Sequence, residues 1–187
     1  MKSIITLLLT LFTTLVFSQK DCVYNSDVKD SLGIYKSTKD YLIHERYFGN
    51  NKTSIYFSLI NADGLLSLSI QIIQKDTEFI VAKCFDKNSK IYLQLANGKI
   101  FTFIGMEQET CGSLLRNENE NIRVLSAYFL FMKENFEELK KSPISLVRIK
   151  FSGETQDYVI KPELISELDQ SIYNPSNYFI DFLKCIE

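Results

Sequence analysis

The segment from residue 91 to residue 103 constrains the fold most, because it predicts two strands joined by a tight turn. Residues 91–96 and 99–103 are rich in β-branched and aromatic side chains, and Asn97-Gly98 lies between them. Asn-Gly tolerates the positive φ angles of a two-residue type I′ turn, whose twist matches that of the flanking strands. We therefore expect an antiparallel hairpin centred on Asn97-Gly98.

A second segment shows the alternation of a half-buried strand over residues 66–73. Its apolar positions alternate mainly with polar ones; they are Leu66, Leu68, Ile70 and Ile72. The turn residues of segment 61–64 separate it from the apolar run 55–59, which predicts a second hairpin. Further strands are expected at 41–48 and 122–131, and a last hairpin joins 146–151 to 158–160.

Helices are expected in three places. Residues 135–142 predict a short helix that ends before Pro143. Pro162 suits a helix start, and Leu164, Ile165 and Leu168 recur at helical spacing. Asn174-Pro175 ends that helix and is expected to cap another. The apolar face of this last helix would hold Tyr178, Phe179, Phe182 and Leu183.

These elements predict an α+β domain, with an antiparallel β meander of about eight strands. A short helix near 134–142 and the C-terminal helices would pack on the sheet. We expect residues 19–37 to be a loosely ordered leader, residues 106–121 to be a loop, and residues 38–187 to form a single domain. The chain shows no internal repeat.

The first eighteen residues predict a cleaved secretory signal peptide. Lys2 precedes an apolar run of fourteen residues, which is too short for a membrane span of about 20 residues. Val16 and Ser18 occupy the −3 and −1 positions of a cleavage site. Cys22 follows Gln19-Lys20-Asp21 rather than a small residue, so we expect an exported, periplasmic or secreted, soluble protein and not a lipoprotein.

The charge balance of the mature chain predicts which partners it does not attract. Removal of residues 1–18 leaves 169 residues, with 20 basic and 23 acidic side chains. A near-neutral chain is not steered towards nucleic acid or an anionic membrane. No further stretch is long and apolar enough to span a bilayer.

Four cysteines in an exported chain predict two disulfides, with three possible connectivities. Cys84 lies 13 residues before Asn97, and Cys111 lies 13 residues after Gly98. An extended hairpin would bring these two together, although polar residues 86–90 interrupt the first strand. Cys22 and Cys185 would then tie the ends of the mature chain together. The alternatives are the other two connectivities and free thiols.

No residue pattern predicts catalysis, and we expect no cofactor and no metal. His44 is the only histidine, which excludes sites that need two histidine ligands. It is a candidate acid–base residue beside Glu45, but neighbours on a strand point to opposite faces. His44 is expected to share a face with Leu42, Arg46 and Phe48, as an ordinary strand histidine.

Three weaker features point to binding or modification. Residues 116–121 are rich in side-chain oxygen but lack the spaced aspartates of a calcium loop, which favours a solvated loop. Asn51-Lys52-Thr53 matches the N-glycosylation pattern. The 10 tyrosines and 14 phenylalanines include candidates for a sugar-binding face, but the chain has no Trp and most are expected in the core.

Three stretches, 91–100, 142–149 and 178–185, resemble in this order small exported bacterial proteins of uncharacterised families. The resemblance covers about half of the mature chain. It implies an α+β domain of the cell envelope or the secreted fraction, and no functional residue is carried over from it.

The function expected from sequence is a non-enzymatic exported domain that binds a protein or an envelope component. One alternative is a small extracytoplasmic hydrolase that uses His44 or an unassigned pair of carboxylates. Another is an inhibitor or immunity-type partner of a second exported protein.

Overall fold

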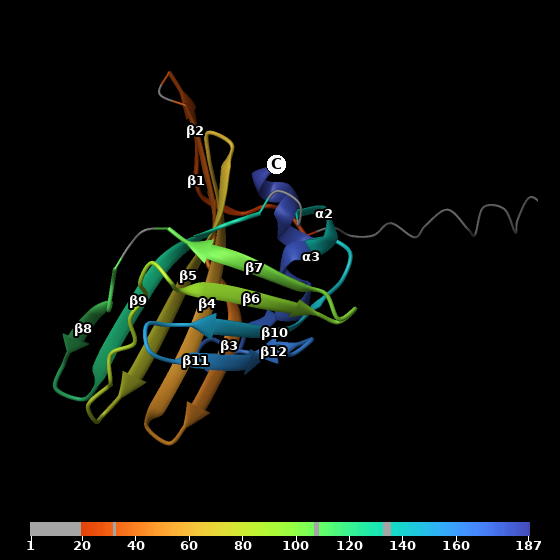
Figure 1. Ribbon diagram of the computed structural model, residues 1–187. Coiled ribbons are helices and arrows are strands. Elements are labelled where there is room, and N and C mark those ends of the chain that lie inside the picture. The colour runs from red at the N-terminus through yellow and green to blue at the C-terminus, as the bar shows by residue number, and fades with distance from the viewer. Residues whose placement is uncertain (1–19, 32, 107–108, 133–135) are drawn as a thin grey trace, which may run out of the picture.

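The computed structural model describes residues 20–31, 33–106, 109–132 and 136–187 (Figure 1). The predicted signal peptide, residues 1–18, lies outside the described residues. None of the helices in the described part of the chain is long and apolar enough to cross a membrane.

Most of the described chain is β-structure. The main antiparallel sheet has eleven strands: β1 Tyr24–Asp30, β2 Gly33–Thr38, β3 Tyr41–Phe48, β4 Asn51–Ala62, β5 Leu65–Asp76, β6 Lys90–Leu95, β7 Ile100–Gly105, β8 Ser113–Arg116, β9 Asn121–Leu130, β10 Ile144–Lys150 and β11 Thr155–Val159. A separate two-stranded sheet pairs β12 Leu164–Ile165 with β13 Ile172–Tyr173. The helical segments are α2 Phe136–Leu139, η2 Pro175–Asn177, α3 Tyr178–Phe182 and η3 Leu183–Ile186.

The main sheet folds over on itself to make two layers. Its strand order is β1-β2-β4-β5-β9-β7-β6-β10-β11, with β3 also paired to β4 and β8 to β9. Among the described residues only two pairs, Ile104↔Leu130 and Gly105↔Phe129, join β7 to β9. At this narrow junction the sheet turns, so that β6, β7, β10 and β11 cross in front of β3, β4, β5 and β9 (Figure 1).

The core lies between the two layers, where the inward-facing side chains of the central strands are mostly apolar. One layer contributes Phe57, Leu59, Leu68, Ile70, Ile72, Leu125, Ala127 and Phe129. The other layer contributes Ile91, Leu93, Leu95, Phe101, Phe103, Val147, Ile149 and Phe151. The C-terminal helical segments pack against this core through Tyr178, Phe179, Leu183 and Ile186.

The predicted α+β class is wrong. The helices are short, and the sheet has more strands than the eight expected. The short helix expected near 134–142 is a four-residue turn, α2, with residues 133–135 outside the described part. The loop expected at 106–121 contains the short strand β8. The loop prediction therefore fails over these four residues, because β9 offers them an edge to pair with.

The prediction of a loosely ordered leader at residues 19–37 is also wrong, because most of this segment forms the strands β1 and β2. The sequence of this hairpin is polar, so alternation does not reveal it. β4 is twelve residues long and extends beyond β3, so its far end pairs with β2 through Tyr35, Lys36 and Ser37. A long neighbour thus supplies the backbone partners that order a polar segment.

The helix expected to begin at Pro162 is instead the β12–β13 hairpin. Leu164 is buried and Ile165 is exposed, which is the alternation of a strand. The Ser166 amide donates to the Ser171 carbonyl at 3.0 Å, and Gln170 has a φ of 59° in the turn. Apolar residues at i, i+1 and i+4 fit both structures over so short a segment, and packing on β3 selects the hairpin.

The expected hairpins are present, but the Asn97-Gly98 turn is one residue longer than predicted. Gln94 pairs with Ile100 and Lys90 with Ile104, so the centre of the pairing is Asn97. The Gly98 amide donates to the Leu95 carbonyl at 2.9 Å, and Gly98 has a φ of 85°. A left-handed glycine after a turn is the signature of a three-residue hairpin loop with a bulge.

The C-terminal helix is present as α3, between the turns η2 and η3. Tyr178, Phe179 and Leu183 are buried as predicted. The expected cap is absent, because the Asn174 side chain makes no capping hydrogen bond.

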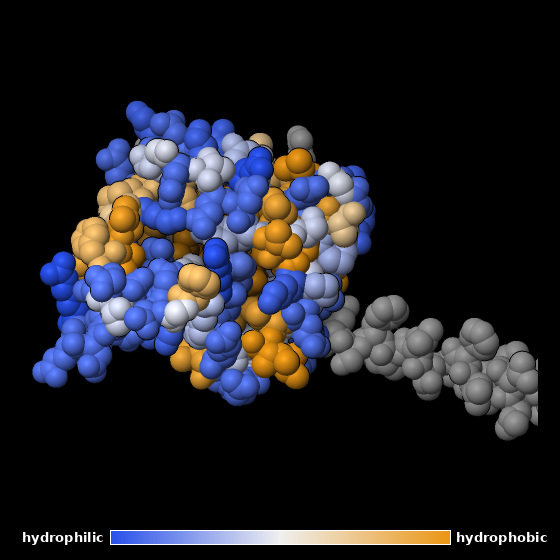
Figure 2. All heavy atoms as spheres, turned by 90° about the horizontal axis from the view of Figure 1, so that it is seen from below, coloured by the Kyte–Doolittle hydropathy of each residue, from blue (hydrophilic) through white to orange (hydrophobic). Residues whose placement is uncertain are grey.

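Exposed apolar side chains are scattered over loops and strand ends. The most exposed are Phe48, Phe79, Val81, Val159 and Leu168. Figure 2, a view from below, shows apolar residues in separate groups on a mostly hydrophilic face. Scattered exposure of this kind is usual for a globular protein and needs no binding partner to explain it.

Candidate ligand-binding pocket

A pocket of about 550 Å³ lies where the N-terminal segment, the β2–β3 turn, the β12–β13 hairpin and α3 meet. We call it the Tyr41 pocket. Its volume falls within the range of small-molecule sites, about 300–1,000 Å³. Four aromatic rings line it, and they belong to Tyr41, Tyr173, Tyr178 and Phe182.

Tyr41 is the central ring, because the other three pack around it. Its ring centroid lies 5.1 Å from that of Tyr173, 5.6 Å from Tyr178 and 5.0 Å from Phe182. Tyr41 is the first residue of β3 and pairs with Phe57, so it lies at the border of the core. Rings at these distances attract one another beyond their apolar burial, which gives the pocket an ordered aromatic wall.

Lys20 closes one side of this wall. Its ammonium lies 5.6 Å from the Tyr41 ring centroid and 6.0 Å from that of Phe182. It donates to the Tyr41 hydroxyl at 3.3 Å and forms an ion pair with Asp181 at 3.6 Å. With the Asn174 amide oxygen turned towards it, Lys20 has a further acceptor at 3.2 Å. The lysine charge is thus already balanced by this chain's own groups.

The N-terminal segment is held at the pocket by a disulfide and by two hydrogen bonds. Cys22 is bonded to Cys185 of η3. The Tyr24 hydroxyl donates to the Cys185 carbonyl at 2.9 Å. The Lys39 amide donates to the Val23 carbonyl at 2.9 Å. Covalent anchoring two residues after Lys20 fixes the lysine against the aromatic wall.

Burial shapes the acidity of the tyrosines in the wall. Desolvation raises the pKa of Tyr173, and the nearby Asp169 carboxylate raises it further. Desolvation also raises the pKa of Tyr178, whose hydroxyl lies beside Thr38 without a well-aligned hydrogen-bond partner. Both phenols are therefore neutral at physiological pH.

Polar groups of both signs surround the rings at the pocket. They are Lys20, Asp21, Thr38, Lys39, Asp40 and Ser171. Two cations and two carboxylates balance, so the lining gives no strong preference for a charged ligand. The arrangement favours a neutral ligand with a flat apolar face for the rings and hydroxyl groups for the polar side chains.

The predicted disulfides join the same pairs of cysteines in the structure: Cys22–Cys185 and Cys84–Cys111. Phe85 and Thr110 exchange two backbone hydrogen bonds, of 2.8 and 3.1 Å, as an isolated bridge. Cys84 and Cys111 are the next pair outward. The polar interruption at 86–89 shifts the register by one residue, which offsets the longer turn at Asn97.

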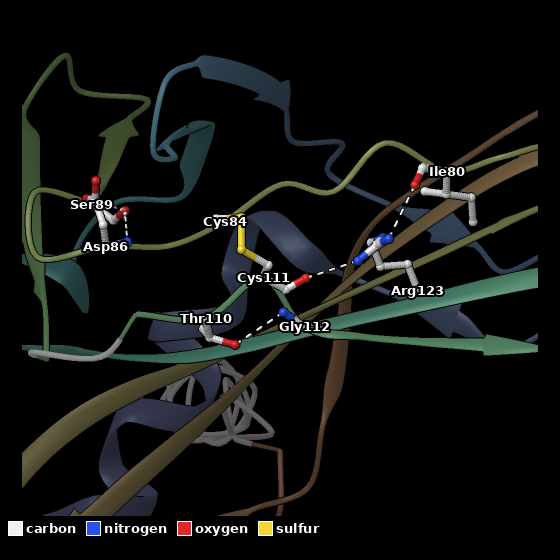
Figure 3. The surroundings of a disulfide bond; sticks show 8 residues. All are labelled: Ile80, Cys84, Asp86, Ser89, Thr110, Cys111, Gly112 and Arg123. Atoms are coloured by element: carbon white, nitrogen blue, oxygen red, sulfur yellow. Dashed lines mark hydrogen bonds between the residues drawn. A yellow bond between two sulfur atoms is a disulfide. The ribbon is translucent and has the colours of Figure 1, made fainter.

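Arg123, on the buried face of β9, lies beside the Cys84–Cys111 disulfide and reaches the Cys111 carbonyl (Figure 3). Arg123 is 8% exposed and donates to the carbonyls of Cys111, at 3.2 Å, and Ile80, at 3.4 Å. A Cβ atom on Gly112 would lie 2.2 Å from the Val124 carbonyl oxygen, so only glycine fits there. Arg123 thus holds two loop segments against the sheet, and the region is structural.

His44 lies away from the pocket, between the edges of β3 and β11. Its ring centroid lies 5.1 Å from that of Tyr158, and it hydrogen-bonds the Val159 backbone. A bulge at Ile43 places His44 opposite Ile55, on the inner face, so the expected shared face with Leu42 is wrong. Burial lowers the pKa of His44. The histidine links the two layers.

Glu45, on the opposite face of β3, holds the β12–β13 hairpin. Its carboxylate accepts from the Ser166 hydroxyl at 3.3 Å and from the Glu167 amide at 2.7 Å. His44 and Glu45 therefore do not act on one site. Their separate packing roles fit the ordinary strand histidine expected from sequence and give no support to the weaker acid–base candidate.

The oxygen-rich segment 116–121 closes a turn with its own side chains. The Asn117 side-chain oxygen accepts from the amides of Asn119, at 2.9 Å, and Glu120, at 2.7 Å. Within the described ranges no group of three or more His, Cys, Asp or Glu side chains is placed to hold a metal ion. Asn51 donates to Asp76 at 2.9 Å, and its glycosylation stays a prediction.

Sequence reasoning missed the Tyr41 pocket because its residues are spread from Lys20 to Phe182. The one usable signal was the predicted Cys22–Cys185 pair, which brings these two ends together. No family model, curated protein or solved structure matches this chain. The chemistry of the pocket is therefore the basis for a functional proposal.

Proposed function

We propose that this chain is an exported binding protein whose Tyr41 pocket takes a neutral sugar unit of an envelope or extracellular glycan. The observation that carries the proposal is the pairing of an aromatic wall with a charge-balanced polar rim. A sugar ring presents a flat apolar face and several hydroxyl groups, which match these two parts of the pocket.

The fixed position of Lys20 supports a neutral ligand. An anionic ligand would compete with Asp181 for Lys20. A cationic ligand would find its place over the Tyr41 and Phe182 rings already taken by the Lys20 ammonium. An apolar ligand in the pocket would remove water from Asp40, Ser171 and the other polar groups without giving them hydrogen-bond partners. Sugar hydroxyls would instead replace the water that these groups lose.

Export is part of the proposal, and two features support it. The two disulfides are typical of proteins that fold in oxidising compartments. The predicted signal peptide would place the first residue of the mature chain at Gln19. N-terminal sequencing of the protein from periplasmic and extracellular fractions tests this, and a chain that keeps residues 1–18 in the cytoplasm would contradict it.

Binding is tested on an array of neutral oligosaccharides, followed by titration calorimetry with the strongest hit. Tyr173→Ala removes one wall of the pocket and is expected to weaken binding at least tenfold. Tyr128→Ala is the matched control, because Tyr128 is an exposed tyrosine of β9 outside the pocket lining. Equal losses in both variants, or the absence of any bound glycan, would contradict the proposal.

Catalysis is the second candidate, because Asp21 and Asp40 both line the pocket and glycoside hydrolysis needs two carboxylates. Both side chains are exposed, whereas a general acid in such a reaction is usually desolvated. Incubation with the bound glycan distinguishes the two. Release of reducing ends that Asp21→Asn or Asp40→Asn abolishes would replace the binding role with a hydrolytic one.

A further inference from the structure

β1 and β2 form an arm together with the adjoining ends of β4 and β5. The arm rises above the two layers, and β1 is its outermost strand (Figure 1). On its inner edge β1 pairs with β2, and no described strand pairs with its outer edge. Such an open edge offers unpaired backbone groups to another strand.

Hydrogen bonds across the arm show which residues of β1 face outward. The Ile34 amide donates to the Asp63 carboxylate at 2.6 Å, and the Ile34 carbonyl accepts from the Asp63 amide at 2.9 Å. The backbone amide and carbonyl of Ile34 therefore point away from β1, and those of its neighbour Tyr35 point towards β1. Tyr35 pairs with Val28, so Val28 turns its backbone groups inward. Asp27 and Lys29 must then direct theirs to the open edge.

We propose that the open edge of β1 pairs antiparallel with the same edge of a second copy, with the two-fold axis at Val28. In this register Asp27 of each copy lies opposite Lys29 of the other, and the two residues exchange backbone hydrogen bonds. Opposite charges in directly opposed positions stabilise a strand pair, and like charges destabilise it. The interface is self-complementary, as a two-fold dimer requires.

The neighbouring registers are disfavoured by charge. An axis at Asp27 would place the two Asp27 carboxylates opposite each other, and an axis at Lys29 would oppose two lysines. A lysine on an open edge normally discourages pairing. Here Lys29 meets a carboxylate in one register only, so the same residue that protects the edge also selects the pairing.

Apolar residues support the same register on one face of the arm. Val28 pairs with Tyr35, Tyr35 with Ala62, and Ala62 with Leu65, so the four side chains form a row across four strands. Val28 is 45% exposed, Tyr35 43% and Leu65 51%. A two-fold axis at Val28 joins this row to its copy and makes one apolar row across both arms.

The dimer is expected to be weak, because few residues of each copy take part. Interfaces well below 1,200 Å² belong to transient complexes, so we expect dissociation in the micromolar to millimolar range. The proposal does not depend on the Tyr41 pocket, and glycan binding does not decide it.

Sedimentation velocity of the mature, oxidised chain from about 5 μM to 1 mM tests the proposal. Asp27→Lys places a lysine opposite Lys29 at both opposed positions of the dimer, and Lys29→Asp places an aspartate opposite Asp27 at both. Each variant is expected to raise the dimer dissociation constant at least tenfold. An equimolar mixture of the two variants is expected to dimerise again, because a lysine then meets an aspartate at both opposed positions of the mixed pair. The double exchange D27K/K29D is expected to dimerise alone.

A further variant tests the backbone hydrogen bonds of the proposed strand pair directly, by removing one of the amides that would form them. Lys29→Pro removes an amide that faces the open edge and leaves the β1–β2 ladder intact, so it is expected to give a folded monomer. Circular dichroism confirms folding of each variant. A wild-type chain that stays monomeric at 1 mM would overturn the proposal. So would variants that dimerise as the wild type does, or a mixture that fails to recover.

Discussion

The two disulfides anchor two regions of the molecule in different ways. Cys22–Cys185 spans 163 residues and joins the two ends of the folded domain beside the Tyr41 pocket. Cys84–Cys111 spans 27 residues and lies beside a backbone bridge that already aligns its two segments. The long-range bond therefore adds a covalent link to a segment that a few hydrogen bonds and one ion pair otherwise hold, whereas the short-range bond reinforces an alignment that a backbone bridge already sets.

The non-covalent contacts around the two disulfides also differ: those beside Cys84 are buried and apolar, and those beside Cys22 are near the surface and mostly polar. Next to Cys84, Phe85 is buried between Phe129 and Phe151, with ring centroids 5.4 and 5.1 Å away. Next to Cys22, Lys20 and Asp21 lie near the surface, and their contacts are mostly polar or cation–π. Loss of a disulfide should thus release the N-terminal segment more completely than the Cys84 segment.

The largest expected effect is that of C22S/C185S. Opening a loop of 163 residues is expected to lower the free energy of unfolding by about 5 kcal/mol, from the entropy gained by the unfolded chain. Urea denaturation followed by circular dichroism measures the loss. Amide hydrogen exchange should rise at residues 20–24. Unchanged exchange at these residues would show that the polar contacts alone hold the segment.

C84S/C111S is expected to cost less, about 3.5 kcal/mol by the same reasoning for a 27-residue loop. Because Phe85 and the Arg123 hydrogen bonds remain, exchange at residues 83–86 and 110–112 should rise only modestly. The two double variants are compared under identical conditions. A larger loss from the short loop than from the long one would show that Cys84–Cys111 is the stronger anchor.

The two disulfides also mark what the sequence could and could not predict. The Cys84–Cys111 pair follows from symmetry about a hairpin turn, which is a local pattern. It was right even though the turn is one residue longer than expected, because a polar interruption shifted the register back. The Cys22–Cys185 pair followed only by elimination. No local sequence pattern predicted the Tyr41 pocket beside it, because the pocket residues are spread along the chain.

Tertiary partners explain the remaining errors. The β1–β2 hairpin forms on the far end of β4, and its polar sequence carries no alternation to predict it. The 162–173 segment fits a helix by spacing, but Glu45 binds it as a hairpin on β3. The face of His44 was wrong because a bulge at Ile43 shifts it. Two of these errors concern a partner distant in sequence and the third concerns a bulge within a hairpin, and neither kind of feature is visible in the period or propensity of the segment itself.

A smaller effect is expected from His44, which joins the two layers without a covalent bond. Burial lowers the pKa of His44 in the folded protein below 6.5, so the unfolded chain binds the proton more readily. The stability that neutral His44 contributes to the folded state is fully present above pH 6.5. It is lost as the pH falls from 6.5 towards the folded-state pKa of His44. Within this window each pH unit costs up to about 1.4 kcal/mol.

The variant His44→Gln removes this titration and is expected to flatten the stability profile between pH 7 and pH 5. Urea denaturation at intervals of half a pH unit measures both proteins. The difference in unfolding free energy between wild type and variant should shrink or change sign as the pH falls. A difference that stays constant across the window would contradict the linkage of His44 to the junction between β3 and β11.

The smallest expected effect is that of Tyr41→Phe, which keeps the central ring of the pocket and removes its hydroxyl. That hydroxyl accepts from the Asn174 amide at 2.8 Å and from Lys20 at 3.3 Å. Loss of the acceptor is expected to cost about 1 kcal/mol, because the amide stays near water. Tyr128→Phe, on an exposed tyrosine, should cost less than about 0.5 kcal/mol.

If the disulfide Cys22–Cys185 is the main anchor, Tyr41→Phe should also leave amide exchange at residues 20–24 unchanged. A loss of stability near that of C22S/C185S would show that the hydroxyl network, and not the covalent bond, holds the N-terminal segment to the pocket.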